Sequence, residues 1–197
     1  MEGDVFVSNV TNIMIVGVGG QGSLLASRLL GNALVSEGYD VKVSEVHGMS
    51  QRGGSVVTYV RFGDKVYSPV IDKGEADYIL SFEKLEAARW MEYLRRDGKI
   101  IVNTQEIDPM PVVTGAMNYP ENVIEKMTAK GVHVIPVDAL TLAEEAGSPK
   151  ATNIVLMGVL SKYMGFERAV WEKALEAVVP SKFLELNKKA FALGEAV

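Results

Sequence analysis

Hydrophobic positions near the start of the chain change from a continuous run to a helical repeat and then to an alternating pattern. Residues 12–18, NIMIVGV, are almost wholly apolar over the length of a strand, as expected for a parallel strand buried on both faces. Residues 20–37 repeat apolar side chains at helical spacing until Gly38 ends the helix. Residues 40–46, DVKVSEV, alternate as a second strand, so the three segments predict a βαβ unit.

The middle of the chain continues the alternation of strands and helices. Buried strands are predicted at 76–82 (ADYILSF), 99–104 (KIIVNT) and 132–138 (VHVIPVD), with helices at 83–96, 121–130 and 139–147. The first of these helices is expected to end near Gly98. From Lys150 onward the pattern is helical. A mostly parallel sheet with helices on both faces follows from this order.

Residues 55–70, SVVTYVRFGDKVYSPV, depart from that pattern. Two β-rich runs flank Gly63 and Asp64, a pair suited to a two-residue turn, so we expect an antiparallel hairpin here. The predicted fold class is α/β, with a doubly wound, mostly parallel, Rossmann-like sheet, an added antiparallel hairpin and a helical carboxy-terminal segment. No repeat or linker divides the sequence, so residues 1–197 are expected to form a single domain.

Composition narrows the functional classes. The chain has no cysteine, which excludes disulfides, zinc–thiolate sites and cysteine-held iron–sulfur clusters within it. Its two histidines, His47 and His133, lie far apart, so no metal site is expected. A formal net charge of −5 argues against nucleic-acid binding. The start, MEGDVFVSN, lacks a secretory pattern and no apolar stretch could span a bilayer, so a cytoplasmic protein without membrane contact is expected.

The turn between the first strand and the first helix carries a candidate binding motif. Gly17, Gly19 and Gly22 fit the pattern G-x-G-x-x-G. Glycines at these positions allow a tight turn and let a pyrophosphate approach the backbone at the amino terminus of the helix. Glu45 follows Gly22 by 23 residues, where a ribose-binding carboxylate is expected. These residues are typical of a dinucleotide site.

Two features favour another use of the same turn. It also contains Gly20 and the bulky, polar Gln21, which suggests that a backbone or polar group approaches from outside. Neither a hydride-transfer site nor a second catalytic domain follows it. A bound dinucleotide and a structural or subunit-facing turn therefore both remain open.

The loop after the second predicted strand, SEVHGMSQRGGSVV at 44–57, is the other candidate. Arg52 beside Gly53 and Gly54 could clamp a phosphate or carboxylate, with neighbouring amides forming an anion-binding nest. The alternative is a loop of turn glycines in which Arg52 pairs with an acidic neighbour. A structural role for His47 is favoured over a general base oriented by Glu45, so no catalytic residue is assigned. Late in the chain, an amide in KATNIVLMGVL, Asn153, could cap a neighbouring loop or bond to a partner.

Four segments taken in order resemble a known family. They are IVGVGGQG, SEVHGMSQRGGSVV, ADYILSFEKLEAARW and KATNIVLMGVLSKYMG. Together they resemble the gamma-type subunit of the 2-oxoacid:ferredoxin oxidoreductases, over residues 10–190. Within that family the similarity is greatest to the indolepyruvate branch, in which the domain stands alone as the small (beta) subunit. The glycine-rich turn paired with a downstream R-G-G is far more specific than the glycine motif by itself.

The resemblance implies a subunit of an enzyme that oxidatively decarboxylates aryl 2-oxoacids such as indolepyruvate, with coenzyme A as co-substrate and ferredoxin as acceptor. It implies that thiamine diphosphate and the iron–sulfur clusters are carried on a larger alpha subunit, and that the isolated chain is inactive. Residues 17–22 and 52–54 are then expected to face the cleft of the complex. The alternatives are a stand-alone NAD(P)-binding Rossmann protein and a regulatory nucleotide-binding module.

Overall fold

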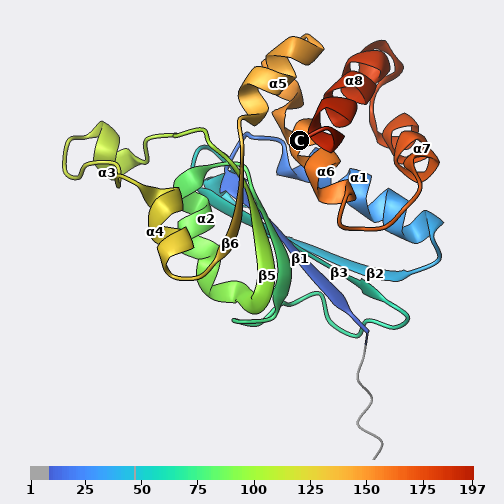
Figure 1. Cartoon of the computed structure of the whole chain (residues 1–197), viewed down its shortest axis with the longest axis horizontal. Coiled ribbons are helices and arrows are strands. Elements are labelled where there is room, and N and C mark those ends of the chain that lie inside the picture. The colour runs from blue at the N-terminus through green and yellow to red at the C-terminus, as the bar shows by residue number, and fades with distance from the viewer. Residues whose placement is uncertain (1–8, 47) are drawn as a thin grey trace, which may run out of the picture.

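One sheet of six strands forms the centre of the computed structural model, which describes residues 9–46 and 48–197 (Figure 1). The strands are β1 (Thr11–Val18), β2 (Asp40–Val46), β3 (Ser55–Gly63), β4 (Ala76–Ser81), β5 (Leu94–Asn103) and β6 (His133–Val137). Their order across the sheet is β2-β3-β1-β4-β5-β6. Pairings β1–β4, β4–β5 and β5–β6 are parallel, whereas β3 is antiparallel to both β1 and β2.

Helices cover both faces of the sheet, so the doubly wound α/β prediction is confirmed (Figure 1). They are α1 (Ser23–Ser36), α2 (Lys84–Trp90), α3 (Met110–Val113), α4 (Val123–Ala129), α5 (Ala139–Ala146), α6 (Thr152–Ser161), α7 (Arg168–Val178) and α8 (Leu184–Glu195). On one face α1 and α6 contact the strands, with α5, α7 and α8 packed on these helices. On the other face lie α2 and α4. Within the described residues, no helix is long and apolar enough to cross a membrane.

The central strand β1 explains the continuous apolar run that begins the sequence. Successive side chains of a strand point to opposite faces, so both faces need apolar residues when both are covered. Ile13 and Ile15 belong to the core under α1 and α6, whereas Met14 and Val16 belong to the core under α2 and α4. All four side chains are 0% exposed. The sheet is therefore held by two separate hydrophobic cores.

The antiparallel element is present, but the hairpin turn predicted at Gly63 and Asp64 is wrong. The hairpin consists of β2 and β3, joined by residues 47–54. Since β3 lies between β1 and β2, neither of its edges is left for a strand after Gly63. The chain beyond it is held instead by Asp40, which accepts the Val66 N–H at 3.0 Å, and by Arg61, which donates to the Val70 carbonyl at 2.8 Å.

The helix predicted at 83–96 is shorter than expected. It ends at Trp90, a 3₁₀ turn spans Met91–Tyr93, and β5 begins at Leu94. Gly98 therefore lies inside a strand rather than at the end of a helix. A β-carbon at Gly98 would lie 2.9 Å from the Ala76 carbonyl oxygen, so this glycine allows two strands to approach closely where their register shifts.

The carboxy-terminal helices form a compact layer around α6. Nearly every residue of α6 is buried, which explains why its sequence is apolar on all sides. Helix α8 crosses it at a pair of glycines: a β-carbon at Gly194 would lie 2.0 Å from the Val155 carbonyl oxygen, and one at Gly158 would lie 2.2 Å from that of Phe191. The helical carboxy-terminal segment predicted from the sequence is confirmed.

Candidate functional site

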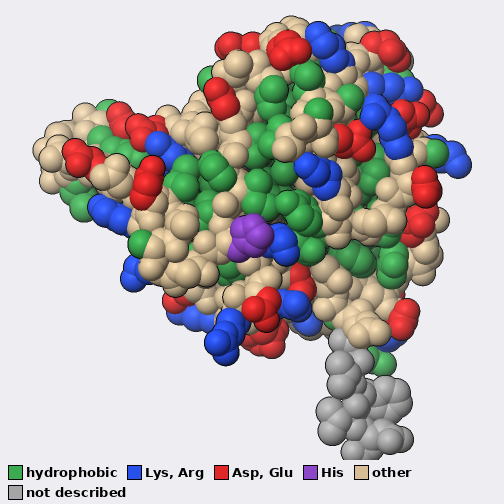
Figure 2. Space-filling view, viewed as in Figure 1, with side chains coloured by type: hydrophobic (Ala, Val, Ile, Leu, Met, Phe, Trp, Pro, Cys, Tyr) green, Lys and Arg blue, Asp and Glu red, His purple; other side chains and the backbone are tan. Residues whose placement is uncertain are grey.

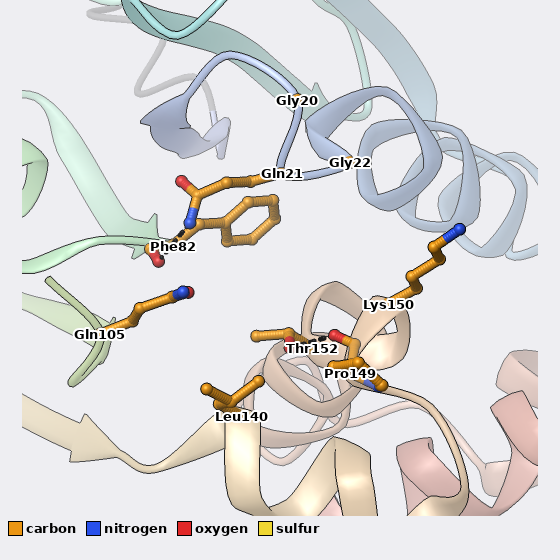
Figure 3. Close-up of a pocket in the computed structure, with 9 residues that line it drawn as sticks. All are labelled: Gly20, Gln21, Gly22, Phe82, Gln105, Leu140, Pro149, Lys150 and Thr152. Carbon is orange, nitrogen blue, oxygen red and sulfur yellow. Dashed lines mark hydrogen bonds between the residues drawn. The ribbon is translucent and has the colours of Figure 1, made fainter. Parts of the chain in front are cut away.

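A cavity of about 410 Å³ lies where the sheet changes winding direction (Figure 3). From β1 the chain leads through α1 toward one edge of the sheet, whereas from β4 it leads through α2 toward the other. The carboxyl ends of two such adjacent parallel strands form the usual ligand crevice of open α/β sheets. We call this the switch-point cavity. It is lined by Gly20, Gln21, Gly22, Phe82, Gln105, Leu140, Pro149, Lys150 and Thr152.

The side chain of Gln21 ties the glycine-rich turn to the neighbouring strand. Its Oε1 accepts a hydrogen bond from the Val18 N–H at 2.7 Å, and its Nε2 donates to the Phe82 carbonyl at 2.9 Å (Figure 3). Gly17 leaves room for it, because a β-carbon there would lie 2.8 Å from Gln21 Oε1. The polar group that approaches this turn therefore belongs to the chain itself.

The loop at 48–54 packs directly against Gly19. The Gly19 N–H donates to the Gly54 carbonyl at 2.8 Å, and the Gly54 N–H donates to that of Ser50 at 2.8 Å. A β-carbon at Gly19 would lie only 2.3 Å from the Ser50 carbonyl oxygen and 2.6 Å from the Gln51 Cα. In a dinucleotide fold the middle glycine gives this space to a pyrophosphate. Here the chain's own backbone fills it.

The other two glycines of the turn differ in their surroundings. Gly20 has φ +103° and no heavy atom within 4 Å of the position its β-carbon would take, so it leaves open space beside the switch-point cavity. Gly22, with φ +86°, precedes α1, and its carbonyl accepts a hydrogen bond from Asn153 Nδ2 at 3.1 Å. Of the two roles left open for Asn153, the structure shows a bond to a neighbouring loop, and this bond joins the start of α6 to the start of α1.

The remaining sequence candidates lie apart from that cavity. Arg52 is exposed, and within the described part of the chain its guanidinium makes no hydrogen bond or ion pair. Gly53 has φ +92° and borders, with Gly54, another cavity of about 270 Å³. Glu45 accepts a hydrogen bond from Ser27 Oγ at 2.6 Å and lines a separate hollow beside α1. His47 lies outside the described residues.

A pair of buried carboxylates was not identified from the sequence. Glu83 is 1% exposed and caps α2, because it accepts the Glu86 N–H at 2.9 Å. It also accepts a hydrogen bond from the Tyr119 hydroxyl. Burial, together with the hydrogen bond to Glu83, raises the pKa of Tyr119 far above its usual range. The available signal was a glutamate three residues before another one, directly after a buried strand.

The second carboxylate, Glu86, borders the cavity next to Gly53 and Gly54. It accepts a hydrogen bond from the Ser55 hydroxyl, and Arg89 Nε lies 3.3 Å from its Oε1. Burial raises the pKa of Glu86, although the contacts with Ser55 and Arg89 oppose that shift. The loop at 48–54 therefore packs against the glycine-rich turn on one side and borders, on the other, the cavity that Glu86 also lines.

Several apolar side chains are exposed on the surface of the molecule. Leu24, Val46 and Met49 are 40%, 50% and 80% exposed and lie around the glycine-rich turn or its loop. Figure 2 shows further hydrophobic side chains gathered in the middle of the face viewed there, with a histidine and a few Lys or Arg side chains beside them. Among residues 9–46 and 48–197, no group of three or more potential metal ligands converges.

Nearly the whole chain matches the sequence model of a known family. Residues 12–197 match the pyruvate ferredoxin/flavodoxin oxidoreductase family. The chain belongs to this family. The resemblance inferred from the four motifs is confirmed, and the chain is a subunit of an oxidoreductase that acts on 2-oxoacids with ferredoxin.

Individual relatives refine this assignment. Indolepyruvate oxidoreductase subunit IorB of Thermococcus kodakarensis is 46% identical over 189 residues, which cover 93% of this chain and 93% of that protein. The subunit of the same name from Archaeoglobus fulgidus is 42% identical over 93% of this chain and 92% of its own length. The pyruvate/ketoisovalerate oxidoreductases common subunit gamma of Thermococcus litoralis is 29% identical over 88% of this chain and 87% of its own length.

Solved structures support the fold. Pyruvate oxidoreductase subunit PORC of Thermotoga maritima superposes with a TM-score of 0.71 at 22% identity, covering 95% of this chain and 96% of that one. The 2-oxoglutarate:ferredoxin oxidoreductase from Magnetococcus marinus gives 0.72 at 19% identity, and the chain covers only 30% of that longer polypeptide. The same α/β domain therefore occurs both as a separate chain and as part of a larger one.

Proposed function

We propose that the chain is the small subunit of a coenzyme A-dependent indolepyruvate:ferredoxin oxidoreductase. The observation that carries this proposal is the identity of 42–46% to three indolepyruvate oxidoreductase subunits over 93% of the chain. Common gamma subunits of pyruvate/ketoisovalerate oxidoreductases reach only 27–29%. The reaction converts indolepyruvate, coenzyme A and oxidised ferredoxin to indoleacetyl-coenzyme A, carbon dioxide, a proton and reduced ferredoxin, with two electrons transferred.

The chain depends on a partner for the redox chemistry. It has no cysteine, so it cannot supply cysteine ligands to the iron–sulfur clusters that collect electrons. A larger alpha subunit carries those clusters and thiamine diphosphate, which supplies the decarboxylation chemistry when bound. The complex meets ferredoxin in the cytoplasm. The residues of this chain do not enter the bond-breaking steps; they shape and close the cleft.

The glycine-rich turn and the loop at 48–54 form the surface that faces the partner. Leu24, Val46 and Met49 supply exposed apolar side chains around it, as expected for a surface that is covered in a complex. The contacts of Gln21 and Gly19 hold this surface rigid before assembly. A preformed surface limits the conformational entropy that is lost on binding.

The same surface receives the anionic end of coenzyme A. The exposed Arg52 guanidinium has no partner among the described residues and lies beside the Gly53 amide. Across the turn, Lys150 adds a second cation at the switch-point cavity, where Gly20 leaves space. Guanidinium and backbone amide groups together are suited to phosphate oxygens. The role of Glu45 in cofactor binding stays a prediction.

A stand-alone NAD(P)-binding protein is the competing function. It requires the pyrophosphate to approach Gly19, where the backbone of Ser50 and Gln51 already lies. A regulatory nucleotide-binding module has the same requirement. Both alternatives predict saturable binding of NAD(P) by the isolated chain, whereas the subunit proposal predicts none.

The decisive experiment is anaerobic co-expression of the chain with the cysteine-rich large subunit from the same source. The purified brown complex is assayed for indolepyruvate-dependent reduction of ferredoxin, with and without coenzyme A. Activity that requires both chains and coenzyme A supports the proposal. An isolated chain that oxidises or reduces a substrate with nicotinamide would overturn it, as would an active large subunit that gains nothing from this chain.

A further inference from the structure

An apolar cavity of about 370 Å³ lies beside the switch-point cavity, on the side of α8. Most of its lining is apolar and comes from α1, from the residues after α7 and from the start of α8: Leu25, Val179, Pro180, Phe183 and Leu186. We call it the α8 cavity. Its volume falls within the range of about 300 to 1,000 Å³ that small-molecule sites occupy. None of the cofactor-binding residues predicted from the sequence lines it.

Asn187 gives this cavity an unused hydrogen-bond acceptor. The side chain is 8% exposed, and its Nδ2 donates to the Phe183 carbonyl at 2.8 Å, which fixes the orientation of the amide. No described residue donates to its Oδ1. Among the described residues only the Trp171 indole nitrogen is both fully enclosed and unpaired, so Oδ1 keeps some exposed surface, and Asn187 is one of the residues that line the cavity. A polar group of this kind in an otherwise apolar lining can fix the orientation of a ligand by accepting its N–H.

Cations border the cavity, and its lining contains no carboxylate. Lys150 lines both this cavity and the switch-point cavity, so the two adjoin at its side chain. Lys182 Nζ lies 4.7 Å from the centroid of the Phe183 ring, which is 48% exposed. The arrangement is an apolar chamber with an aromatic wall, one inward acceptor and a positive border.

We propose that the α8 cavity binds a flat aromatic ring that carries an N–H donor and is attached to an anionic group. The ring packs against Phe183 and the leucine side chains, since aromatic pairs add stabilisation to the burial of apolar area. The N–H donates to Asn187 Oδ1. The anionic group extends toward Lys150 and the switch-point cavity.

The identity of the ligand rests on the proposed function. In that function, two molecules combine an aromatic ring, an N–H donor and an anionic group. Indolepyruvate joins an indole N–H to a carboxylate, and coenzyme A joins the amino group of adenine to phosphates. Both molecules offer the same groups to the cavity; they differ in whether the ring is the indole of the substrate or the adenine of the co-substrate. Substrate selection, or recognition of the co-substrate, would then belong partly to this chain.

Binding to the full-length chain tests the cavity without the complex. Indole-3-acetate and adenosine 3′,5′-bisphosphate are titrated in by NMR, and 1-methylindole-3-acetate serves as the probe without an N–H. We expect saturable binding of at least one of the first two, weakened roughly five- to tenfold by Asn187→Leu, as loss of one hydrogen bond implies. Asn32→Leu is the matched control, because Asn32 Nδ2 also donates to a carbonyl four residues earlier, at 2.9 Å, on an exposed part of α1. Binding of neither probe overturns the proposal.

A second pair of variants keeps the proposal testable if Asn187→Leu does not fold. Lys150 is exposed, so Lys150→Gln should fold. It should weaken binding of the anionic probe several-fold, whereas Lys130→Gln, directly after α4, should not. In the complex, Asn187→Leu should raise the KM for indolepyruvate if the indole is the source, or for coenzyme A if adenine is. Unchanged KM values with normal turnover would overturn the inference and leave the proposed function standing. A complex without 2-oxoacid oxidation would overturn the proposed function, while the binding titrations would still decide the cavity.

Discussion

A β-carbon at Gly19 would lie 2.3 Å from the backbone carbonyl oxygen of Ser50. The glycine-rich turn and the loop that follows β2 are therefore one structural unit, although each looks like a separate binding motif in the sequence. The Gly19 N–H also donates to the Gly54 carbonyl, so the contact is both steric and hydrogen-bonded. The space that a dinucleotide fold gives to a pyrophosphate is used here to hold a loop.

Gly19→Ala should destabilise the chain. The new methyl group meets backbone atoms of Ser50 and Gln51, which cannot rotate away as a side chain would, so the loop must shift. We expect a loss of about 1–3 kcal/mol in the free energy of unfolding, as for other overpacked sites. Urea denaturation followed by circular dichroism measures it.

The matched control is Gly31→Ala in α1. No heavy atom lies within 4 Å of its β-carbon position, and its φ is not positive. A helical alanine there should stabilise the chain by about 0.5–1 kcal/mol. If Gly19→Ala were as stable as the wild type, the loop at 48–54 would not be fixed by its contact with the turn.

Gln21→Ala should also destabilise the chain, for a different reason. The variant leaves the Val18 N–H without its acceptor, whereas the Phe82 carbonyl keeps a hydrogen bond from Asn103 Nδ2 at 3.2 Å. The expected loss is about 1–3 kcal/mol, the cost of one unsatisfied buried donor. Gln51→Ala, at an exposed glutamine, should change stability by less than about 0.5 kcal/mol. Equal stabilities of the two variants would show that Gln21 is not a structural link.

The strands and most helices could be predicted because their signals are local. The apolar run of β1 requires cover on both faces, and the sheet supplies it. The predicted turn at Gly63 failed because turn chemistry says nothing about which edges of a strand are already paired. Both edges of β3 are occupied, by β1 and β2. A local pattern could not reveal that a later strand inserts between two earlier ones.

The candidate site could likewise be predicted only in part from the sequence. The glycine motif predicts a tight turn before α1, and that turn is present. Its occupant, the backbone of Ser50, could not be predicted, because the contact depends on how β3 returns along β1. The hydrogen bond between Tyr119 and Glu83 joins residues 36 positions apart. Neither hydrophobic periodicity nor a motif encodes such a pair.

The stability of the chain should depend on the protonation of Glu86. Burial raises the pKa of Glu86 in the folded chain above its ordinary value of 4.5. The folded state therefore holds this proton more tightly than the unfolded state does. The resulting stabilisation is fully present below pH 4.5 and is lost as the pH rises through the raised pKa.

Glu86→Gln removes that titration, because the amide stays neutral at every pH. Relative to the wild type, the variant should become progressively more stable as the pH rises from 4.5 toward neutrality. Urea denaturation of both proteins at a series of pH values measures the difference. A difference that is constant with pH would mean that Glu86 has the same pKa in the folded and unfolded chains.

Arg52→Ala, made in the assembled enzyme, tests the role of the 48–54 loop. In the described part of the chain the Arg52 guanidinium makes no hydrogen bond or ion pair, so its removal should leave the fold intact. If it binds the anionic end of coenzyme A, the KM for coenzyme A should rise roughly tenfold, as loss of a charged hydrogen bond implies. Steady-state kinetics at fixed indolepyruvate measures this change.

Arg96→Ala is the control for Arg52. Arg96 is also exposed but lies near the amino end of β5, whereas the glycine-rich turn lies at the carboxyl end of the parallel strand β1. Its loss alters the net charge by the same amount, so any general electrostatic effect on coenzyme A should appear in both variants. A rise in KM for coenzyme A that occurs only in Arg52→Ala identifies a direct contact. If the contact is ionic, high salt also weakens the binding of coenzyme A to the wild type, so the difference in KM between the two enzymes becomes smaller. Identical kinetics in the two variants would place the phosphates of coenzyme A elsewhere, and the loop would then serve only to join the subunits.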